Sequence, residues 1–128
     1  MNNFDTTDIE QAFGQVLEDA GVTSLVFNNR PKAKVQSADF AVVRVGYDVE
    51  DLAAYGVCSV RIALYARDVD NFKNGVKLGI MYDKLLEGMP METGRYLVDP
   101  NPVIAPDLAD DYGFHARIVT FKITIKAV

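Results

Sequence analysis

The final stretch of the chain, from Tyr112 to Val128, constrains the fold more than any other part of the sequence. From Val119 onward, β-branched and aromatic residues alternate with threonine and lysine, which predicts a long, half-buried antiparallel strand. Upstream the phase reverses, because Phe114, Ala116 and Ile118 form the apolar set there. The adjacent apolar residues at 118 and 119 therefore predict a switch of buried face, through a β-bulge or through a strand that leaves its own sheet to meet a neighbouring subunit.

Other segments carry the same strand signal. Residues from Tyr55 to Arg67 and from Asp39 to Val49 alternate in the same way, and Ser24–Phe27 is a shorter strand candidate. The buried face of the first of these segments is expected to include Cys58, which would behave there as a small hydrophobe. Because the sequence has one cysteine, it cannot form an internal disulfide framework.

A first helix is predicted from Thr7 to Ala20. A capping box over Thr7–Glu10 begins it, and Gly21 stands where a left-handed cap is expected. A second helix is expected to start from a cap at Asp70 or Asn71 and to end near residue 87. Its predicted apolar stripe comprises Phe72, Val76, Leu78, Tyr82, Leu85 and Leu86.

Gly75 and Gly79 lie in the same stripe, so we expect the backbone of this helix to pack close against the sheet there. The next segment, Met89 to Asp111, contains four prolines, which bar a central strand through most of it. Only Gly94–Val98 and Val103–Ile104 are expected to pair briefly. We therefore predict one α+β domain over residues 1–128, with an irregular proline-rich arm at about 89–111. It has two layers: an antiparallel sheet of four to five strands and two helices packed on one face.

Composition narrows the classes of function. The formal charge of −5 does not attract nucleic acid by counterion release. No apolar run approaches the ~20 residues that span a membrane, and Met1 is followed by polar residues, so we expect no secretory leader.

Candidate catalytic groups are few. His115 is the only histidine, and Asp110 or Asp111 could orient it, but no nucleophile turn accompanies it. Asp107 and these two aspartates do not have the spacing of a calcium loop and are predicted to form a solvated acidic loop. We therefore predict no catalytic residue, no metal and no cofactor.

Arginines alternate with apolar residues on the predicted strands. They either extend over the open face of the sheet or meet another protein, where arginine and tyrosine are favoured contact residues. The candidate subunit interface comprises Arg44, Arg61, Tyr65, Arg67, Arg95, Tyr96, Arg117 and Ile118.

The order of motifs resembles a known family. A strand reading CSVRIALYARD enters a helix through DNFKNG, a proline-rich segment contains Gly94-Arg95-Tyr96, and the chain closes on DYGFHARIVTFKITI. This layout resembles the small tail-completion or tail-terminator proteins of tailed bacteriophages. The resemblance implies a homo-oligomer, a hexameric ring that caps the tail tube and joins it to the head, with tail-tube and neck or connector proteins as partners. DNA would pass the channel without specific binding and no membrane would be involved. The protein would reside in the virion, and in the host cytoplasm during assembly.

Two alternatives stay open. The chain could be a small α+β enzyme or ligand-binding domain with its site near Asp111 and His115. It could also be a head-side connector ring of different symmetry, because sequence does not separate six subunits from twelve.

Overall fold

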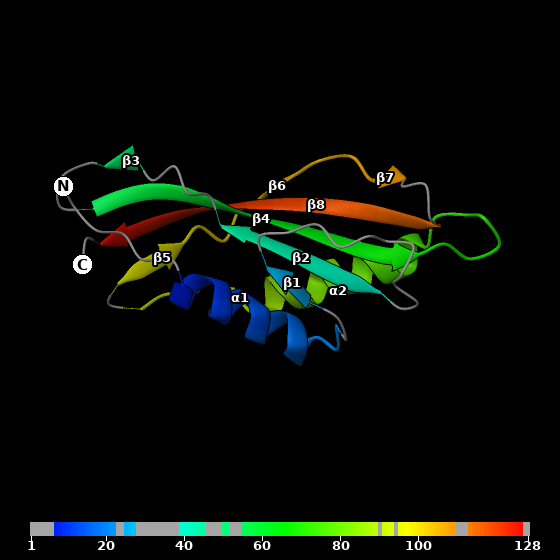
Figure 1. The fold of residues 1–128 in the computed structure, drawn as a ribbon, viewed down its shortest axis with the longest axis horizontal. Coiled ribbons are helices and arrows are strands. Elements are labelled where there is room, and N and C mark those ends of the chain that lie inside the picture. Colours follow the sequence, from blue (N-terminus) through cyan, green and yellow to red (C-terminus); the bar gives the residue numbers. More distant parts are fainter. Residues whose placement is uncertain are drawn as a thin grey trace.

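The computed structural model describes residues 7–22, 25–27, 39–45, 50–51, 55–89, 91–93, 95–109 and 113–126. In this part of the chain, one sheet of eight strands carries two helices on one face (Figure 1). The elements are α1 (Thr7–Asp19), β1 (Leu25–Phe27), β2 (Phe40–Val45), β3 (Glu50–Asp51), β4 (Tyr55–Arg67), α2 (Gly75–Glu87), β5 (Tyr96–Val98), β6 (Val103–Ile104), β7 (Leu108–Ala109) and β8 (Phe114–Lys126). The α+β class with both helices on one face is confirmed. The strands exceed the expected four to five, and β1 pairs with β2 in parallel although the other pairs are antiparallel.

The centre of the sheet is the antiparallel pair of β4 and β8, each 13 residues long. Their register is continuous from the pair Tyr55–Lys126 to the pair Arg67–Phe114. The main strand order is β1-β2-β4-β8-β5. The bulge predicted at Ile118 is therefore wrong, and β8 stays in its own sheet along its whole length. The phase reversal has another cause, because the two halves of β8 bury side chains on opposite faces of the sheet.

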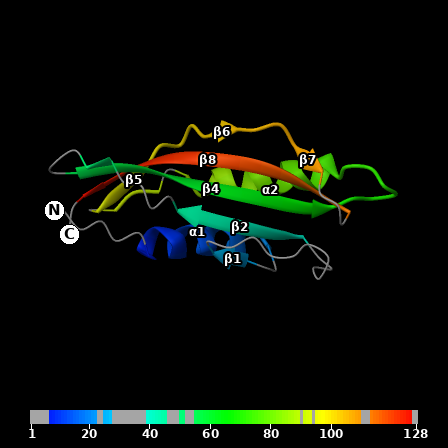
Figure 2. The ribbon, with the colours of Figure 1, turned by 45° about the horizontal axis from the view of Figure 1, so that its top comes forward.

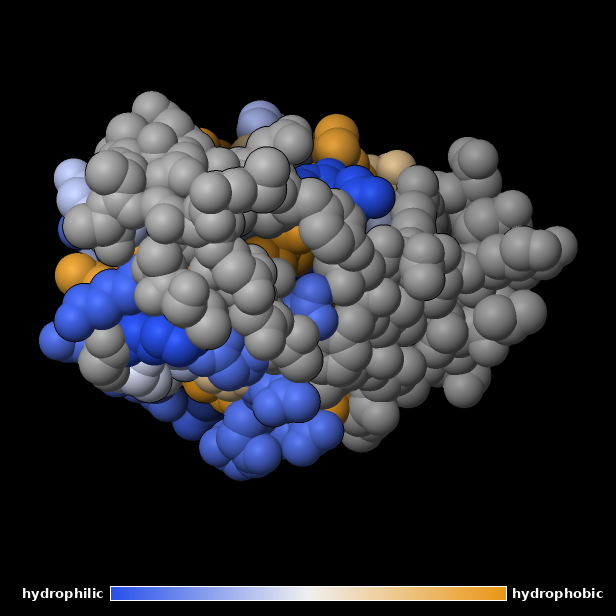
Figure 3. Space-filling model, turned by 60° about the vertical axis from the view of Figure 1, so that its left-hand side comes forward, coloured by the Kyte–Doolittle hydropathy of each residue, from blue (hydrophilic) through white to orange (hydrophobic). Residues whose placement is uncertain are grey.

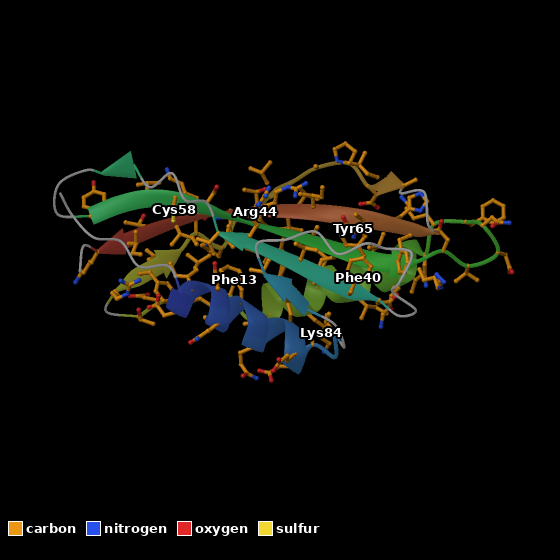
Figure 4. The ribbon with its side chains drawn as sticks, in the orientation of Figure 1. Phe13, Phe40, Arg44, Cys58, Tyr65 and Lys84 are labelled. Carbon is orange, nitrogen blue, oxygen red and sulfur yellow. The ribbon has the colours of Figure 1, made fainter. Side chains whose placement is uncertain are left out.

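The larger core lies between the sheet and the two helices. Phe13 of α1 packs against Phe121 of β8 with ring centroids 5.5 Å apart, and Figure 4 shows Phe13 between α1 and the sheet. The fully or nearly fully buried helix residues around it are Ile9, Leu17, Leu78, Met81 and Leu85. Cys58 lies in this core as predicted, and burial raises the pKa of its thiol.

A second, smaller core lies on the opposite face, toward one end of the sheet. Phe40 of β2 stacks on Tyr65 of β4 at 4.3 Å, and Phe114 of β8 meets Phe40 edge-on at 5.2 Å. Val42, Ala63 and Ala116 complete this cluster. This second core explains why Phe114, Ala116 and Ile118 are apolar. These even-numbered residues of β8 face away from the helices and pack into it.

The proline-rich arm forms a broken edge strand along β8 (Figure 2). The arm advances from Val98 to Val103 while β8 advances only from Ile123 to Thr120, so arm residues are looped out between β5 and β6. Prolines stand in this gap, at positions 100 and 102, where the missing N–H leaves no ladder bond. The two brief pairings are confirmed, and the pairing of β7 is an addition. Pro90 and Gly94 lie outside the described residues.

The end of α1 follows its prediction. Gly21 has φ +83°, and the N–H of Val22 donates to the carbonyl of Leu17, which is the bonding of a left-handed Schellman cap. The side chain of Thr7 lies outside the described residues, so the capping box stays a prediction.

The start of α2 differs from its prediction. Asn74 caps the helix by accepting from the N–H of Lys77, while Asp70 and Asn71 form a turn upstream. The stripe is also corrected, because Val76 faces solvent and Leu78, Met81 and Leu85 are buried. The predicted close approach at Gly75 and Gly79 is wrong.

Gly88, just after α2, makes the close approach instead. A Cβ built there would lie 2.6 Å from Cγ1 of Val16 in α1, whereas nothing lies within 4 Å of one built at Gly79. The end of α2 therefore packs directly against the last turn of α1.

Candidate functional site

The face of β2, β4 and β8 that points away from the helices is called the open face below. Arg44 of β2, Arg61 of β4 and Thr120 of β8 lie in one row across it, because the register pairs 44 with 61 and 61 with 120. Lys122 lies in the next row, opposite Ser59. Arg44, Arg61 and Lys122 are exposed, and together they define the cationic patch.

The cationic patch is uncompensated within the described part of the chain. On β2, β4 and β8 the open face carries arginine and lysine but no carboxylate. No ion pair to Arg44, Arg61 or Lys122 is formed by any described residue. Like charges directly opposite each other in a sheet are destabilising. The opposed arginines are therefore a local cost to the isolated subunit.

Other predicted interface residues are occupied inside the subunit. Tyr65 is only 6% exposed and stacks on Phe40, so it does not offer a contact surface. The guanidinium of Arg67 lies over the ring of Phe114, 5.0 Å from its centroid. Ile118 packs partly buried against the same aromatic cluster.

Arg95 and Tyr96 serve the packing of the arm. The guanidinium of Arg95 donates twice to the carboxylate of Asp8 at 2.9 Å, which ties the arm to the start of α1. Tyr96 is buried, and burial together with the charge of Asp8 raises the pKa of its hydroxyl. These two residues hold β5 against the helix layer.

Arg117 faces the helix side, where it pairs with Asp107 of the arm. Its Nε and a terminal nitrogen each donate to that carboxylate at 3.0 Å, and Lys73 adds an ion pair at 3.2 Å. The hydrogen bonds from Arg117 lower the pKa of Asp107 against the opposing effect of burial, and Lys73 lowers it further. Asp107 therefore serves as a structural anion that joins the arm to β8 and to the segment before α2.

Asp107 was also one of the three aspartates considered as calcium ligands. Asp107 already has two cationic partners, and Asp110 and Asp111 lie outside the described residues. Within the ranges given above, no group of three acidic, histidine or cysteine side chains is placed to hold a metal ion.

His115 has a carboxylate partner that the sequence did not indicate. Its Nδ1 lies 2.6 Å from an oxygen of Asp68, and both side chains are partly buried. The register brings them together, because Asp68 directly follows Arg67 of β4 and His115 directly follows Phe114, the residue of β8 that pairs with Arg67. The spacing of the two long strands was the signal that could have found this pair.

Exposed apolar side chains occur in the connection between β4 and α2, in the edge strands of the arm and on the outer side of α2. Phe72 is 76% exposed and Val69 is 57% exposed, both in the connection between β4 and α2 that extends past the end of the sheet in Figure 1. Val103 and Leu108 of the arm are also exposed. The described surface at the opposite end of the molecule is mainly hydrophilic (Figure 3). Neither described helix is long and apolar enough to cross a bilayer.

Comparison with known proteins defines the fold and nothing finer. No family model matches the sequence, and no curated protein matches it significantly. The chain is similar to a solved structure whose description states no function, with a TM-score of 0.59 and 14% sequence identity over 97% of both chains. This likeness shows a shared α+β fold over nearly the whole length.

Proposed function

We propose that the protein is a non-enzymatic virion component of the tail-terminator or tail-completion class, whose copies assemble into a ring that caps a phage tail tube and joins it to the neck. The observation that carries this proposal is a set of exposed apolar side chains: Val69 and Phe72 in the connection between β4 and α2, and Val103 and Leu108 in the edge strands β6 and β7. Apolar and aromatic side chains at the surface mark contacts between proteins, particularly when they cluster.

Backbone hydrogen bonds hold the segment that carries Phe72 in a defined turn. Val69 and Phe72 exchange two backbone hydrogen bonds of 2.9 Å, and the residues between them have φ values of 51° and 66°. Its base is fixed by the Asp68–His115 contact and by the bond from the N–H of Asp68 to the carbonyl of Gly113. A segment whose backbone is already ordered loses less conformational freedom on binding.

Light scattering coupled to gel filtration tests the proposal. A ring of six copies of the 14.1 kDa chain is expected, either alone or after addition of the tail-tube protein of the same phage. A mass of twelve copies would support the head-side connector alternative. A protein that stays monomeric under both conditions would contradict the proposal.

The paired His115 and Asp68 are the observation that favours the second candidate, a small enzyme or ligand-binding domain. The variant His115→Ala separates the two functions. The ring proposal expects a modest loss of stability and an unchanged assembly, because the imidazole is an anchor of the projecting segment. A ligand found bound to the wild type and lost in His115→Ala would favour the second candidate.

A further inference from the structure

We infer that the cationic patch on the open face docks against the carboxylates on the outer side of α1 in a second copy of this chain. The inference rests on the proposed self-association and identifies the two surfaces that make the contact. The first surface holds opposed like charges in the isolated subunit, and the second carries exposed carboxylates at the end of α1 that could pair with them.

The first surface is the arginine pair. Arg44 and Arg61 are directly opposite each other on neighbouring strands, and both side chains are exposed. Opposed like charges destabilise a sheet relative to neutral pairs. Lys122, one row away, adds a third positive charge. A carboxylate placed over this row by another molecule would turn the repulsion into attraction.

The second surface is the outer side of α1. The helix contains four carboxylates, at Asp8, Glu10, Glu18 and Asp19, and no basic residue. Glu18 and Asp19 are exposed in its last turn. The C-terminal end of a helix carries partial negative charge, so carboxylates there are unfavourable and cations are favourable. The arginines of a second copy would supply those cations.

The two surfaces cannot meet within one subunit. The cationic patch lies on the face of the sheet opposite the helices, and α1 packs on the other face. Figure 4 shows Arg44 at the sheet and Lys84 on the far side of the helix layer. Their contact is therefore between copies and joins two different surfaces. Such head-to-tail contacts close into a ring when the rotation allows it.

A nucleic acid is the other anion that a cationic patch can bind. The chain carries a formal charge of −5 overall. A polyanion would meet this repulsive field on approach. A second copy would present its own acidic helix directly to the patch, which favours self-association.

Two sets of variants test the contact, and both are designed to preserve the subunit. Arg44→Glu places a carboxylate opposite Arg61, and Glu18→Lys with Asp19→Lys places cations at the end of α1. Both changes are locally favourable, so the melting temperatures should stay the same or rise. Sedimentation velocity should nonetheless show self-association weakened by about tenfold or more in each. A purely structural role would not lower association while stability is retained.

The decisive experiment mixes the two kinds of variant. Arg44→Glu/Arg61→Glu and Glu18→Lys/Asp19→Lys should each associate poorly alone, whereas an equimolar mixture should recover assembly because unlike copies now match. Lys77→Glu/Lys126→Glu is the matched control for net charge, since Lys77 makes only an exposed ion pair of 3.7 Å with Asp39 and Lys126 is an exposed residue at the end of β8 outside the cationic patch. It should assemble like the wild type.

The outcomes separate this inference from the proposed function. If the wild type forms a ring and every variant forms the same ring equally well, the inference is overturned and the proposed function stands. If the wild type is monomeric at all concentrations with and without tube protein, both are rejected. If a double-stranded DNA fragment binds the wild type, loses affinity with Arg44→Glu, and self-association is unchanged, the patch serves a polyanion and the inference is overturned.

Discussion

At the scale of single residues, several arginines that looked like contact residues are fixed by internal partners. Arg117 and Arg95 each donate two hydrogen bonds to an aspartate of another segment. Their position on or beside strands was predictable from period-two alternation, but their partners were not. Asp107 is ten residues from Arg117 and Asp8 is 87 residues from Arg95. Only the path of the arm, which alternation does not determine, brings these groups together.

The Asp107 carboxylate is expected to make stability depend on acid pH. Its folded-state pKa is lowered by Arg117 and Lys73, so its contribution is present above the unfolded-state pKa of about 3.9 and is lost as pH falls through the lower folded value. Asp107→Asn should lower the free energy of unfolding by about 1–3 kcal/mol at pH 7. Urea denaturation at pH 7 and at pH 2 checks this prediction, and the difference between variant and wild type should shrink at the lower pH.

Two phenylalanines at opposite extremes of exposure form a matched pair. Phe114 is fully buried between Phe40 and the guanidinium of Arg67, whereas Phe72 is exposed at the projecting segment. Phe114→Ala should cost about 3–5 kcal/mol of stability. Phe72→Ala should leave the melting temperature within a few degrees of the wild type and reduce association. Equal thermal losses in both variants would contradict the existence of a second core on the open face.

At the scale of elements, the connection from β4 to α2 shows why caps and turns are hard to separate by sequence. Asp70 and Asn71 are good helix caps and also tolerate positive φ. Here they take φ values of 51° and 66°, and Asn74 takes the capping role. Positive φ at both central residues matches a type I′ turn, which fits the right-handed twist of paired strands.

This turn makes a favourable substitution possible. Glycine adopts positive φ without steric cost and is preferred at the second central position of a type I′ turn. Asn71→Gly should therefore keep or slightly raise the melting temperature, whereas Asn71→Val should lower it because a β-branched residue resists this conformation. Differential scanning calorimetry of the two variants checks the turn, and the opposite ranking would argue against it.

The junction of the helices predicts a strong effect from a very small change. A methyl group at Gly88 would overlap the branched side chain of Val16, whose χ1 angle is restricted in a helix. Gly88→Ala should cost about 1–3 kcal/mol, as overpacking does in other cores. Gly79→Ala is the control, because open space surrounds that position, and it should be neutral or stabilising. Chemical denaturation of both variants measures the contrast.

At the scale of the whole molecule, the layer arrangement was predictable because alternation and helical stripes both require one shared core. The second core, on the other face of the sheet, was not predictable in this way. Adjacent apolar residues at Ile118 and Val119 are compatible with a bulge and equally with a straight strand that is buried on both faces at different points. The aromatic cluster that decides between them comes from β2, β4 and β8 together. The alternation within β8 alone therefore cannot distinguish a bulge from a second buried face.

The charge separation between the two layers predicts a dependence of assembly on ionic strength. Raising salt from about 0.05 M to about 0.5 M shortens the screening length from above 10 Å to a few ångströms. The wild-type oligomer should dissociate more readily at high salt, while the unfolding midpoint of the monomer changes little. Analytical ultracentrifugation across a salt series measures this, and salt-strengthened association would point to apolar contacts as the dominant force.

The long central pairing of β4 with β8 also has a kinetic consequence. The strands pair across α2 and the entire arm, and even the side chains of Asp68 and His115 at the near end are 47 residues apart in sequence. Non-local pairing of this kind delays the rate-limiting step, so refolding on the millisecond-to-second scale is expected rather than the microsecond collapse of helical bundles. Until β8 arrives, β4 has an unpaired edge beside apolar side chains, and the unfinished chain is then most prone to aggregate.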